Sequence, residues 1–441
     1  MSAFIGRRPN RLSAHGIDSG FTTKGHVKEM RNTAKRLSTA IAAAAVITLG
    51  LTACAGSDAS GGEGGSADGG GETVKIGVVL PFTGVQAAIA ELEGEGAAVA
   101  AEQINEAGGI AGKWQIELVE ADDQLDTGRS ATVIRDLNDK GVSLAIGGQT
   151  SDLCKSSAEA AQRFDMTFIG AHCTSPDLVD PPITDNFFMI GQQMTTLANA
   201  IGTSLAEAYP DVDTWDVVTY DVAAMRSSWD IAKGAMEDEL GHAIQEGERY
   251  AVPVGATTLR NEIAGLVATP DKEKRGLFLG VYGAGTTAFL QQAAPTGILD
   301  DYAVVAQTGV YWPTAVSMDG AAPSITNVHD YFYPCQDTPE NDEFVSAFEA
   351  ATGEKPDSGA YQGYLAVQLL AAAIEKADSI ETAKVQEALK GLTIDTPQGL
   401  EMTIDADTHA GNGAATVAVL AGDSDAPQGV GITECKLVPA G

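Results

Sequence analysis

The sequence is organised around residues 144–178, which read LAIGGQTSDLCKSSAEAAQRFDMTFIGAHCTSPDL. A short apolar run ends in Gly147-Gly148 and leads through a polar loop into a helical pattern at residues 153–164. A second apolar run, residues 166–170, ends in another polar loop. This order of strand, helix and strand predicts two hydroxyl-bearing loops at the carboxyl ends of neighbouring parallel strands, where open α/β sheets bind ligands.

Ser151 and Thr174, one in each loop, are candidate ligand-binding residues. The first loop leads directly into a helix, whose free N–H groups and dipole favour a negatively charged group. The pattern therefore predicts one half of a small-molecule site for a ligand with a carboxylate. The alternative is that Ser151 and Asp152 only cap the helix, because both residue types are common at helix caps.

The amino end has the pattern of an export signal rather than of a folded domain. Basic residues precede a short, alanine-rich apolar run at residues 37–49, and small residues follow it. The run is shorter than the roughly 20 residues that a membrane-spanning helix needs. Met30 stands where such a signal would begin, so we expect translation to start there rather than at Met1.

Cys54 directly follows Leu-Thr-Ala at residues 51–53. This sequence resembles a bacterial lipobox, and the resemblance implies that Cys54 is lipidated and becomes the first residue of the mature protein. The following residues to position 72 are mostly Gly, Ser and Asp and cannot bury enough apolar surface to fold. They are expected to form a flexible tether between a membrane-held lipid and a soluble body.

The charge of the chain argues against a nucleic-acid partner. The net charge is −33, and residues 1–53 have eight Lys or Arg and two acidic residues, so the remainder is near −39. Such an acidic body repels phosphates. We interpret the charge as a solubilising surface rather than as evidence about the ligand.

Four cysteines remain if Cys54 is lipidated, and an even number in an exported protein suggests two disulfides. Three pairings are possible. We favour Cys154 with Cys173, because one opens the helix and the other lies in the neighbouring loop, which leaves Cys335 with Cys435. A zinc site is the rival interpretation, but the spacing lacks a C-x-x-C pair, so no metal and no cofactor is expected.

The remainder of the chain also alternates strand and helix patterns. Strand patterns at residues 74–80 and 114–120 alternate with helical patterns at 87–104 and 127–138. A second β-α-β block follows between residues 186 and 309. The order predicts an α/β protein with two doubly wound, parallel-sheet lobes.

Several short sequence motifs resemble those of a known family. Residues 74–77 and 81–84 are VKIG and PFTG, residues 104–112 are INEAGGIAG, and residues 122–123, 146–148 and 174–178 are DD, IGG and TSPDL. This succession resembles the substrate-binding proteins of branched-chain amino acid ABC importers, which have the type I periplasmic-binding fold.

The resemblance implies two lobes joined by three hinge crossovers, with a ligand in the cleft between them, and closure of the lobes as a hinge motion. The expected division is residues 1–53 as an amino-terminal extension and lipoprotein signal peptide, 54–72 as the lipidated cysteine and flexible tether, 74–193 plus 336–395 as the first lobe, and 194–335 plus 396–441 as the second. The expected protein is a monomer attached by its lipid to the outer face of the cell membrane, with a permease and its ATPases as partners.

The same resemblance implies the site. The loops containing Gln149 and Ser151, and His172, Cys173 and Thr174, would bind the ligand carboxylate. The second lobe would contribute an aromatic residue, Tyr282. Further residues fall on ligand positions of the family but differ in type, and they are Ile89 for a tryptophan, Met225 for a tyrosine and Thr308 for a carboxylate.

Thr308 is the informative departure, because neither it nor Gln307 can neutralise the ligand's ammonium, and an unpaired buried charge is costly. The sequence therefore predicts a small amino acid or a related carboxylate or amide as ligand, with carboxylates and amides bound more strongly than leucine. A sensory lipoprotein reporting to a receptor is the alternative. A hydrolase is a remote one, because the chain has no G-x-S-x-G nucleophile elbow.

Overall fold

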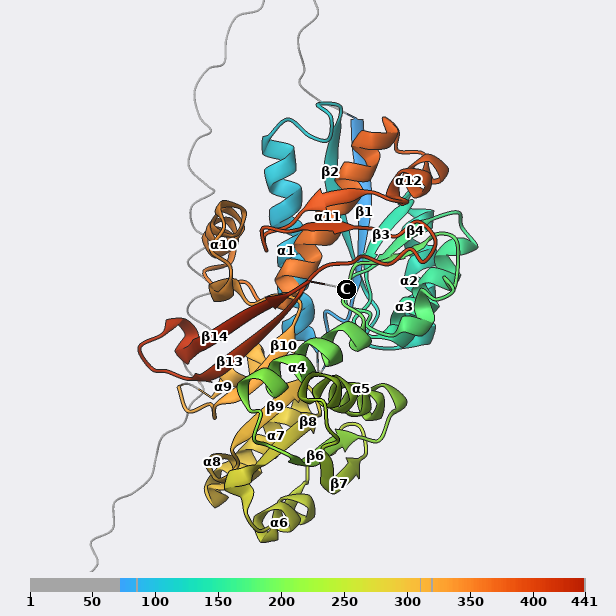
Figure 1. Cartoon of the computed structure of the whole chain (residues 1–441). Coiled ribbons are helices and arrows are strands. Elements are labelled where there is room, and N and C mark those ends of the chain that lie inside the picture. Colours follow the sequence, from blue (N-terminus) through green and yellow to red (C-terminus); the bar gives the residue numbers. More distant parts are fainter. Residues whose placement is uncertain (1–71, 85, 310, 319, 440–441) are drawn as a thin grey trace, which may run out of the picture. The chain divides into compact units, whose positions relative to one another are not determined.

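The computed structural model describes residues 72–439, except residues 85, 310 and 319. The predicted signal peptide, lipidated Cys54 and tether up to residue 71 therefore lie outside the described residues. Helices and strands alternate along most of the described chain (Figure 1).

The fourteen strands of the described residues are β1 (Glu72–Leu80), β2 (Trp114–Asp122), β3 (Leu144–Gly147), β4 (Thr167–Gly170), β5 (Phe187–Met189), β6 (Thr214–Tyr220), β7 (Gln245–Val252), β8 (Arg275–Gly280), β9 (Val304–Thr308), β10 (Ile325–His329), β11 (Thr393–Asp395), β12 (Glu401–Thr403), β13 (Ala415–Gly422) and β14 (Val430–Val438). The α-helices are α1 (Ala87–Glu106), α2 (Thr127–Asp139), α3 (Ser151–Gln162), α4 (Met194–Ala208), α5 (Ala223–Leu240), α6 (Arg260–Ala268), α7 (Ala284–Ala293), α8 (Ile298–Asp301), α9 (Trp312–Ser317), α10 (Pro339–Thr352), α11 (Ser358–Ala377) and α12 (Thr382–Leu389).

The strands form two main sheets, which confirms the predicted α/β fold with two lobes. The first sheet is parallel, in the order β2-β1-β3-β4-β5. The second has the order β14-β13-β10-β9-β8-β6-β7, in which β13 and β14 are antiparallel additions at one edge. The chain passes between the sheets after β5, after β10 and before β13, which gives the three expected crossovers.

Alternation along the strands places the first sheet between two helical layers. Successive side chains of a strand point to opposite faces. In β1, Ile76 and Val78 join the core formed with α1, α10, α11 and α12, whereas Val79 joins the core formed with α2 and α3. In β4, Ile169 joins the first of these cores and Phe168 joins the second. Both faces are therefore buried, as in a doubly wound sheet.

The second sheet is built in the same manner. Val218 and Leu279 pack on the side of α6, α7 and α9, and Val217 and Phe278 pack on the side of α4 and α5. The small β11–β12 hairpin belongs to the first lobe, because Met402 of β12 packs in the first-lobe core. The predicted boundary between residues 395 and 396 instead assigns β11 to the first lobe and β12 to the second.

Helices α1 and α11 lie side by side over the first sheet (Figure 1) and approach at two glycines. A Cβ added to Gly96 would lie 1.9 Å from the Ala360 carbonyl oxygen, and one added to Gly363 would lie 1.9 Å from the Glu93 carbonyl oxygen. Backbone therefore packs against backbone here, and neither position has room for a methyl group.

We expect Gly96→Ala to destabilise the protein by about 3 kcal/mol, because the added methyl group forces the two helices apart. Gly234→Ala in α5 is the matched control, since a Cβ there meets nothing within 4 Å. It should be neutral or stabilising by up to about 1 kcal/mol, because alanine is the better helix former. Urea denaturation measures both. A Gly96→Ala variant as stable as Gly234→Ala would contradict the packing.

Candidate ligand-binding site

Two loops meet at the carboxyl ends of β3 and β4. These strands are parallel neighbours in register, with Gly147 opposite Gly170, so the loops that follow them start side by side. The first loop leads into α3, and the second leads towards β5. The structure thus brings together the two stretches that the sequence analysis singled out.

Ser151 joins the two loops. Its hydroxyl oxygen accepts hydrogen bonds from the backbone N–H groups of Thr174, at 3.3 Å, and Ser175, at 3.1 Å. The cap of α3 is Thr150, whose hydroxyl oxygen accepts from Leu153 N–H at 3.4 Å. Ser151 therefore does not cap the helix through its side chain, and its own O–H remains available to donate.

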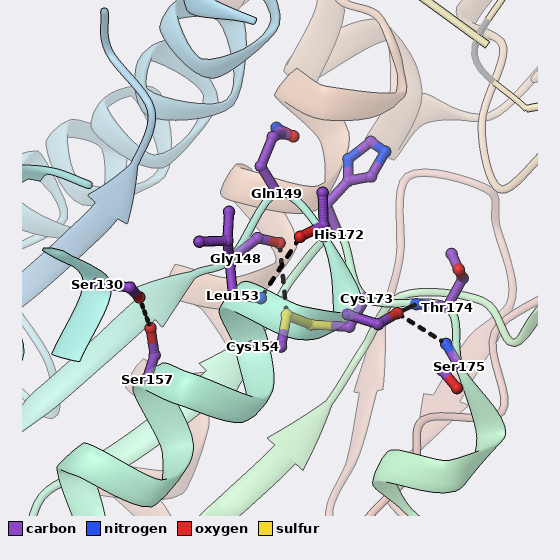
Figure 2. The surroundings of a disulfide bond; sticks show 12 residues. Ser130, Gly148, Gln149, Leu153, Cys154, Ser157, His172, Cys173, Thr174 and Ser175 are labelled. Atoms are coloured by element: carbon purple, nitrogen blue, oxygen red, sulfur yellow. Dashed lines mark hydrogen bonds between the residues drawn. A yellow bond between two sulfur atoms is a disulfide. The ribbon is translucent and has the colours of Figure 1, made fainter. Parts of the chain in front are cut away.

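A disulfide fixes the same two loops to each other. Cys154 and Cys173 are bonded with a Cα–Cα distance of 6.3 Å, and Cys335 is bonded to Cys435 at 5.5 Å, which is the pairing that the sequence favoured. A Cβ on Gly148 would lie 2.4 Å from the Cys154 sulfur, so the glycine is required for the loops to close around the disulfide (Figure 2). The Cys173 side chain is fully buried.

The loop after β4 is also tied to the second lobe. The Thr174 carbonyl accepts a hydrogen bond of 2.8 Å from the N–H of Met194, the first residue of α4. Thr174 thus lies where the loop after β4 meets the first crossover between the lobes.

Gln149 and His172 project from these loops on the side opposite the disulfide (Figure 2). The Gln149 amide donates a 2.9 Å hydrogen bond to the Glu93 carboxylate, and the Nδ1 atom of His172 lies 3.9 Å from the same Glu93 oxygen. Glu93 comes from α1 and is 1% exposed. The other Glu93 oxygen, Gln149 Oε1 and His172 Nδ1 are buried without a hydrogen-bond partner among the described residues.

Glu93, Gln149 and His172 form a first-lobe cluster. This cluster approaches the second lobe through a pair of imidazoles. The ring centres of His172 and His329 are 5.7 Å apart, and His329 ends β10. His329 hydrogen-bonds to Asp330, whose carboxylate also accepts from Gln362 of α11. The carboxyl ends of both sheets therefore meet at this pair.

Burial controls the charge of the cluster. It raises the pKa of Glu93, against the hydrogen bond from Gln149, and the nearby carboxyls of Asp357, Asp330 and Asp123 raise it further. Burial and the His329 imidazole lower the pKa of His172 to about 4. His172 is therefore neutral at neutral pH, and its contact with Glu93 is not an ion pair there.

Tyr282 belongs to the second lobe and packs against Tyr220. The two rings make an edge-to-face contact, with centres 4.9 Å apart. Burial raises the Tyr282 pKa, and Tyr220 and then Asp152 of the first lobe raise it further. The hydroxyl of Tyr220 also donates a 3.2 Å hydrogen bond to the Tyr282 carbonyl.

The other predicted positions belong to β9, α5 and α1. Thr308 is fully buried, with its hydroxyl 3.4 Å from that of Ser228. Met225 is 5% exposed and packs in the second-lobe core, within the first turn of α5 rather than in the expected loop. Ile89 is half-buried on α1, beside Gly359 of α11. None of the three is recorded in contact with the Ser151 loop.

The sequence analysis missed Glu93, His329 and Asp330. A signal for Glu93 was present, because it lies three residues after Ala90 and four before Ala97, on the helical face that the apolar spacing predicts to be buried. A buried carboxylate on such a face is rare unless it is paired. His329 had no such signal, because the short β10 strand was not predicted.

Among residues 72–439 apart from the three gaps, no group of three His, Cys, Asp or Glu side chains is arranged to bind a metal ion. In the same part of the chain, no helix combines the length and apolar character of a membrane span.

We expect His172 to contribute a loss of stability of the folded protein as the pH falls from about 6.5 to 4. The pKa of His172 is about 4 when folded and about 6.5 when unfolded, so the unfolded chain binds more protons in this window. His172→Gln should remove this contribution, which is on the order of 3 kcal/mol when complete. Melting temperatures across the window measure it. His242→Gln removes an exposed imidazole whose pKa is raised by the hydrogen bond with Asp213, so it should retain this acid loss or make it slightly steeper. Parallel profiles for wild type and His172→Gln would contradict the assignment.

Comparison with known proteins agrees with this architecture. The sequence model described as periplasmic binding protein matches residues 73–425. The leucine-, isoleucine-, valine-, threonine- and alanine-binding protein of Pseudomonas aeruginosa is 26% identical over 333 residues, which are 74% of this chain and 85% of that protein.

Solved structures show the same fold. The branched-chain amino acid transporter substrate-binding protein LivJ from Streptococcus pneumoniae, in complex with isoleucine, matches with a TM-score of 0.70 and 21% identity, over 83% of this chain and 100% of that chain. A solute-binding protein of an ABC transporter from Rhodopseudomonas palustris, in complex with p-hydroxybenzoic acid, matches with a TM-score of 0.72 and 17% identity, over 84% and 98%.

Proposed function

Because the chain belongs to the periplasmic binding protein family, we propose that it is the extracytoplasmic solute-binding component of an ABC importer. It binds a small amino acid or a related carboxylate or amide between its two lobes and delivers it to a membrane permease driven by ATPase subunits. The observation that supports this most directly is the Ser151 hydroxyl bridging the two loops at the carboxyl ends of β3 and β4.

The chemistry of the loops fits a carboxylate. The Ser151 O–H and the Thr174 hydroxyl are donors at the start of α3, whose dipole favours an anion. Gln149 and His172 border the same place, and Cys173 could contribute only its backbone, since its sulfur is buried in the disulfide. The proposed remaining ligand contacts are Tyr282, Ile89, Met225 and Thr308.

The relatives support the ligand class. One curated relative is named for aliphatic and small amino acids, and two structural neighbours are complexes with isoleucine and with p-hydroxybenzoic acid. All of these ligands have a carboxylate, whereas only some have an amino group. The loops around Ser151 and Thr174 suit the shared group.

Catalysis is not part of the proposal. The Ser151 oxygen accepts from two backbone amides and has no recorded hydrogen bond to an imidazole, so no base is in place to activate it. This geometry suits ligand binding.

The thermal-shift response of the mature protein tests the ligand contacts, because a ligand that binds only the folded state raises the melting temperature. Among small amino acids, carboxylates and amides we expect at least one stabilising ligand. Ser151→Ala with Thr174→Ala should weaken its binding by about 100-fold, since hydrogen bonds to a charged group are lost.

The control for this experiment is Thr132→Ala with Ser156→Ala, which removes two exposed hydroxyls that bond only to nearby carbonyls. It should retain the shift. Unchanged ligand affinity in the Ser151 and Thr174 variant would overturn the assignment of the site.

The proposal includes a lipid anchor at Cys54. We expect Cys54→Ser to move the protein from the membrane fraction to the soluble fraction of cells, because no acyl chains then hold it. Fractionation and the mass of the mature amino terminus measure this. Ser57→Ala should stay with the membrane, and a membrane-bound Cys54→Ser variant would contradict the anchor.

A further inference from the structure

Several buried carboxyl groups lie near Gln149 and His172, beside the proposed site. Glu93, Asp330 and Asp357 are each at most 3% exposed. Asp330 is paired with His329. Asp357 caps α11 by accepting from Ala360 N–H at 2.9 Å. Glu93 has only the Gln149 amide as a recorded donor, and its nearest imidazole, His172, is neutral at neutral pH.

Unsatisfied acceptors point to the same place. Glu93 Oε1, Gln149 Oε1, Gln362 Oε1 and Asp357 Oδ2 are buried without a hydrogen-bond partner among the described residues. All four belong to residues at most 5% exposed. Unpaired buried acceptors are costly and favour an occupant that donates hydrogen bonds.

This cluster is close to the place proposed for the ligand carboxylate. Gln149 and His172 contact Glu93, and each is two residues from a hydroxyl that would bind the ligand, a backbone span of at most about 7 Å. A ligand carboxylate at Ser151 and Thr174 would therefore lie on the order of 10 Å from the Glu93 carboxyl. Charges at that separation in a partly buried site change an affinity by roughly tenfold.

We propose that Glu93 selects the net charge of the ligand: a carboxylate that also has a protonated amine is accepted, and a bare carboxylate anion is disfavoured. The inference rests on the proposed function, since it assumes that the ligand carboxylate is bound by Ser151 and Thr174. The positive charge of the ligand's amine compensates the Glu93 charge across the site. A bare carboxylate instead adds an uncompensated charge of the same sign.

This alters the expectation drawn from Thr308. The absence of a carboxylate at that position of the second lobe suggested that the site has no partner for an amino group. Glu93 provides a carboxyl from the first lobe instead. Zwitterions should then bind more tightly than the corresponding bare carboxylates.

The pH dependence follows from the groups around Glu93, which are Gln149, His172, Asp330, Asp357 and Asp123. Burial raises the Glu93 pKa, so Glu93 ionises progressively as the pH rises. Bare carboxylates should therefore bind more weakly at higher pH. Above about pH 5 His172 stays neutral and does not contribute to this change.

The test is calorimetric titration of the mature protein with three matched pairs of probes, alanine and propionate, leucine and 4-methylpentanoate, and phenylalanine and 3-phenylpropionate. For the pair that fits the site, the wild type should prefer the amino acid by about tenfold or more at pH 8, and less at pH 5.5. Glu93→Gln, which keeps an acceptor for Gln149, should bind the bare carboxylate about tenfold more tightly at pH 8 and show a smaller pH dependence than the wild type.

Glu95→Gln is the control, because it removes the same charge from an exposed position on the same helix. It should behave as the wild type. The wild-type pH dependence tests the inference even if Glu93→Gln fails to fold.

An equal preference in wild type and Glu93→Gln, or a bare carboxylate that binds as tightly as its amino acid at pH 8, overturns the role of Glu93. The proposed function stands in that case if Ser151→Ala with Thr174→Ala still weakens binding by about 100-fold. Binding that is unaffected by the Ser151 and Thr174 variant overturns the proposed site itself, and absence of binding by all six probes overturns both the ligand class and the inference.

Discussion

The register between β3 and β4 is the constraint on which the site depends. Gly147 lies opposite Gly170, so both strands end at the same level and their loops begin as neighbours. The Cys154–Cys173 disulfide and the bridging Ser151 hydroxyl then join loops that are already adjacent. A shift by one residue would turn the alternating side chains of either strand to the wrong layer, so the two buried cores enforce the register.

The connection between the lobes is polar as well as covalent. Asp330 follows β10 at the second crossover, and its carbonyl accepts from Gln398 and, at 3.4 Å, from Thr416, both in the stretch around the third crossover. Its carboxylate accepts from Gln362 of the first lobe. A single buried residue thus joins two of the three connections with α11, which explains why so much buried polar surface gathers at this place.

The fold and one half of the site could be predicted because their signals are local. Alternating apolar residues and glycine turns mark the strands, and the loop after each strand is polar. The missed parts depend on tertiary contacts. The strand β10 contains Thr326, Asn327 and His329, so it has no apolar run, although all three side chains are buried. Helix α5 begins at Ala223 without a side-chain cap, so nothing in the sequence marks its start before Met225. The role of Glu93 depends on Gln149 and His172, which lie more than 50 residues away in the chain.

The contact of α1 with α11 has a mechanical consequence. At Gly96 and Gly363 main chain touches main chain, and no flexible side-chain layer lies between the helices to be compressed or sheared. The first lobe should therefore respond to load as one stiff block. Any change in the angle between the lobes must then be absorbed in the short crossovers, one of which begins beside the Thr174 carbonyl.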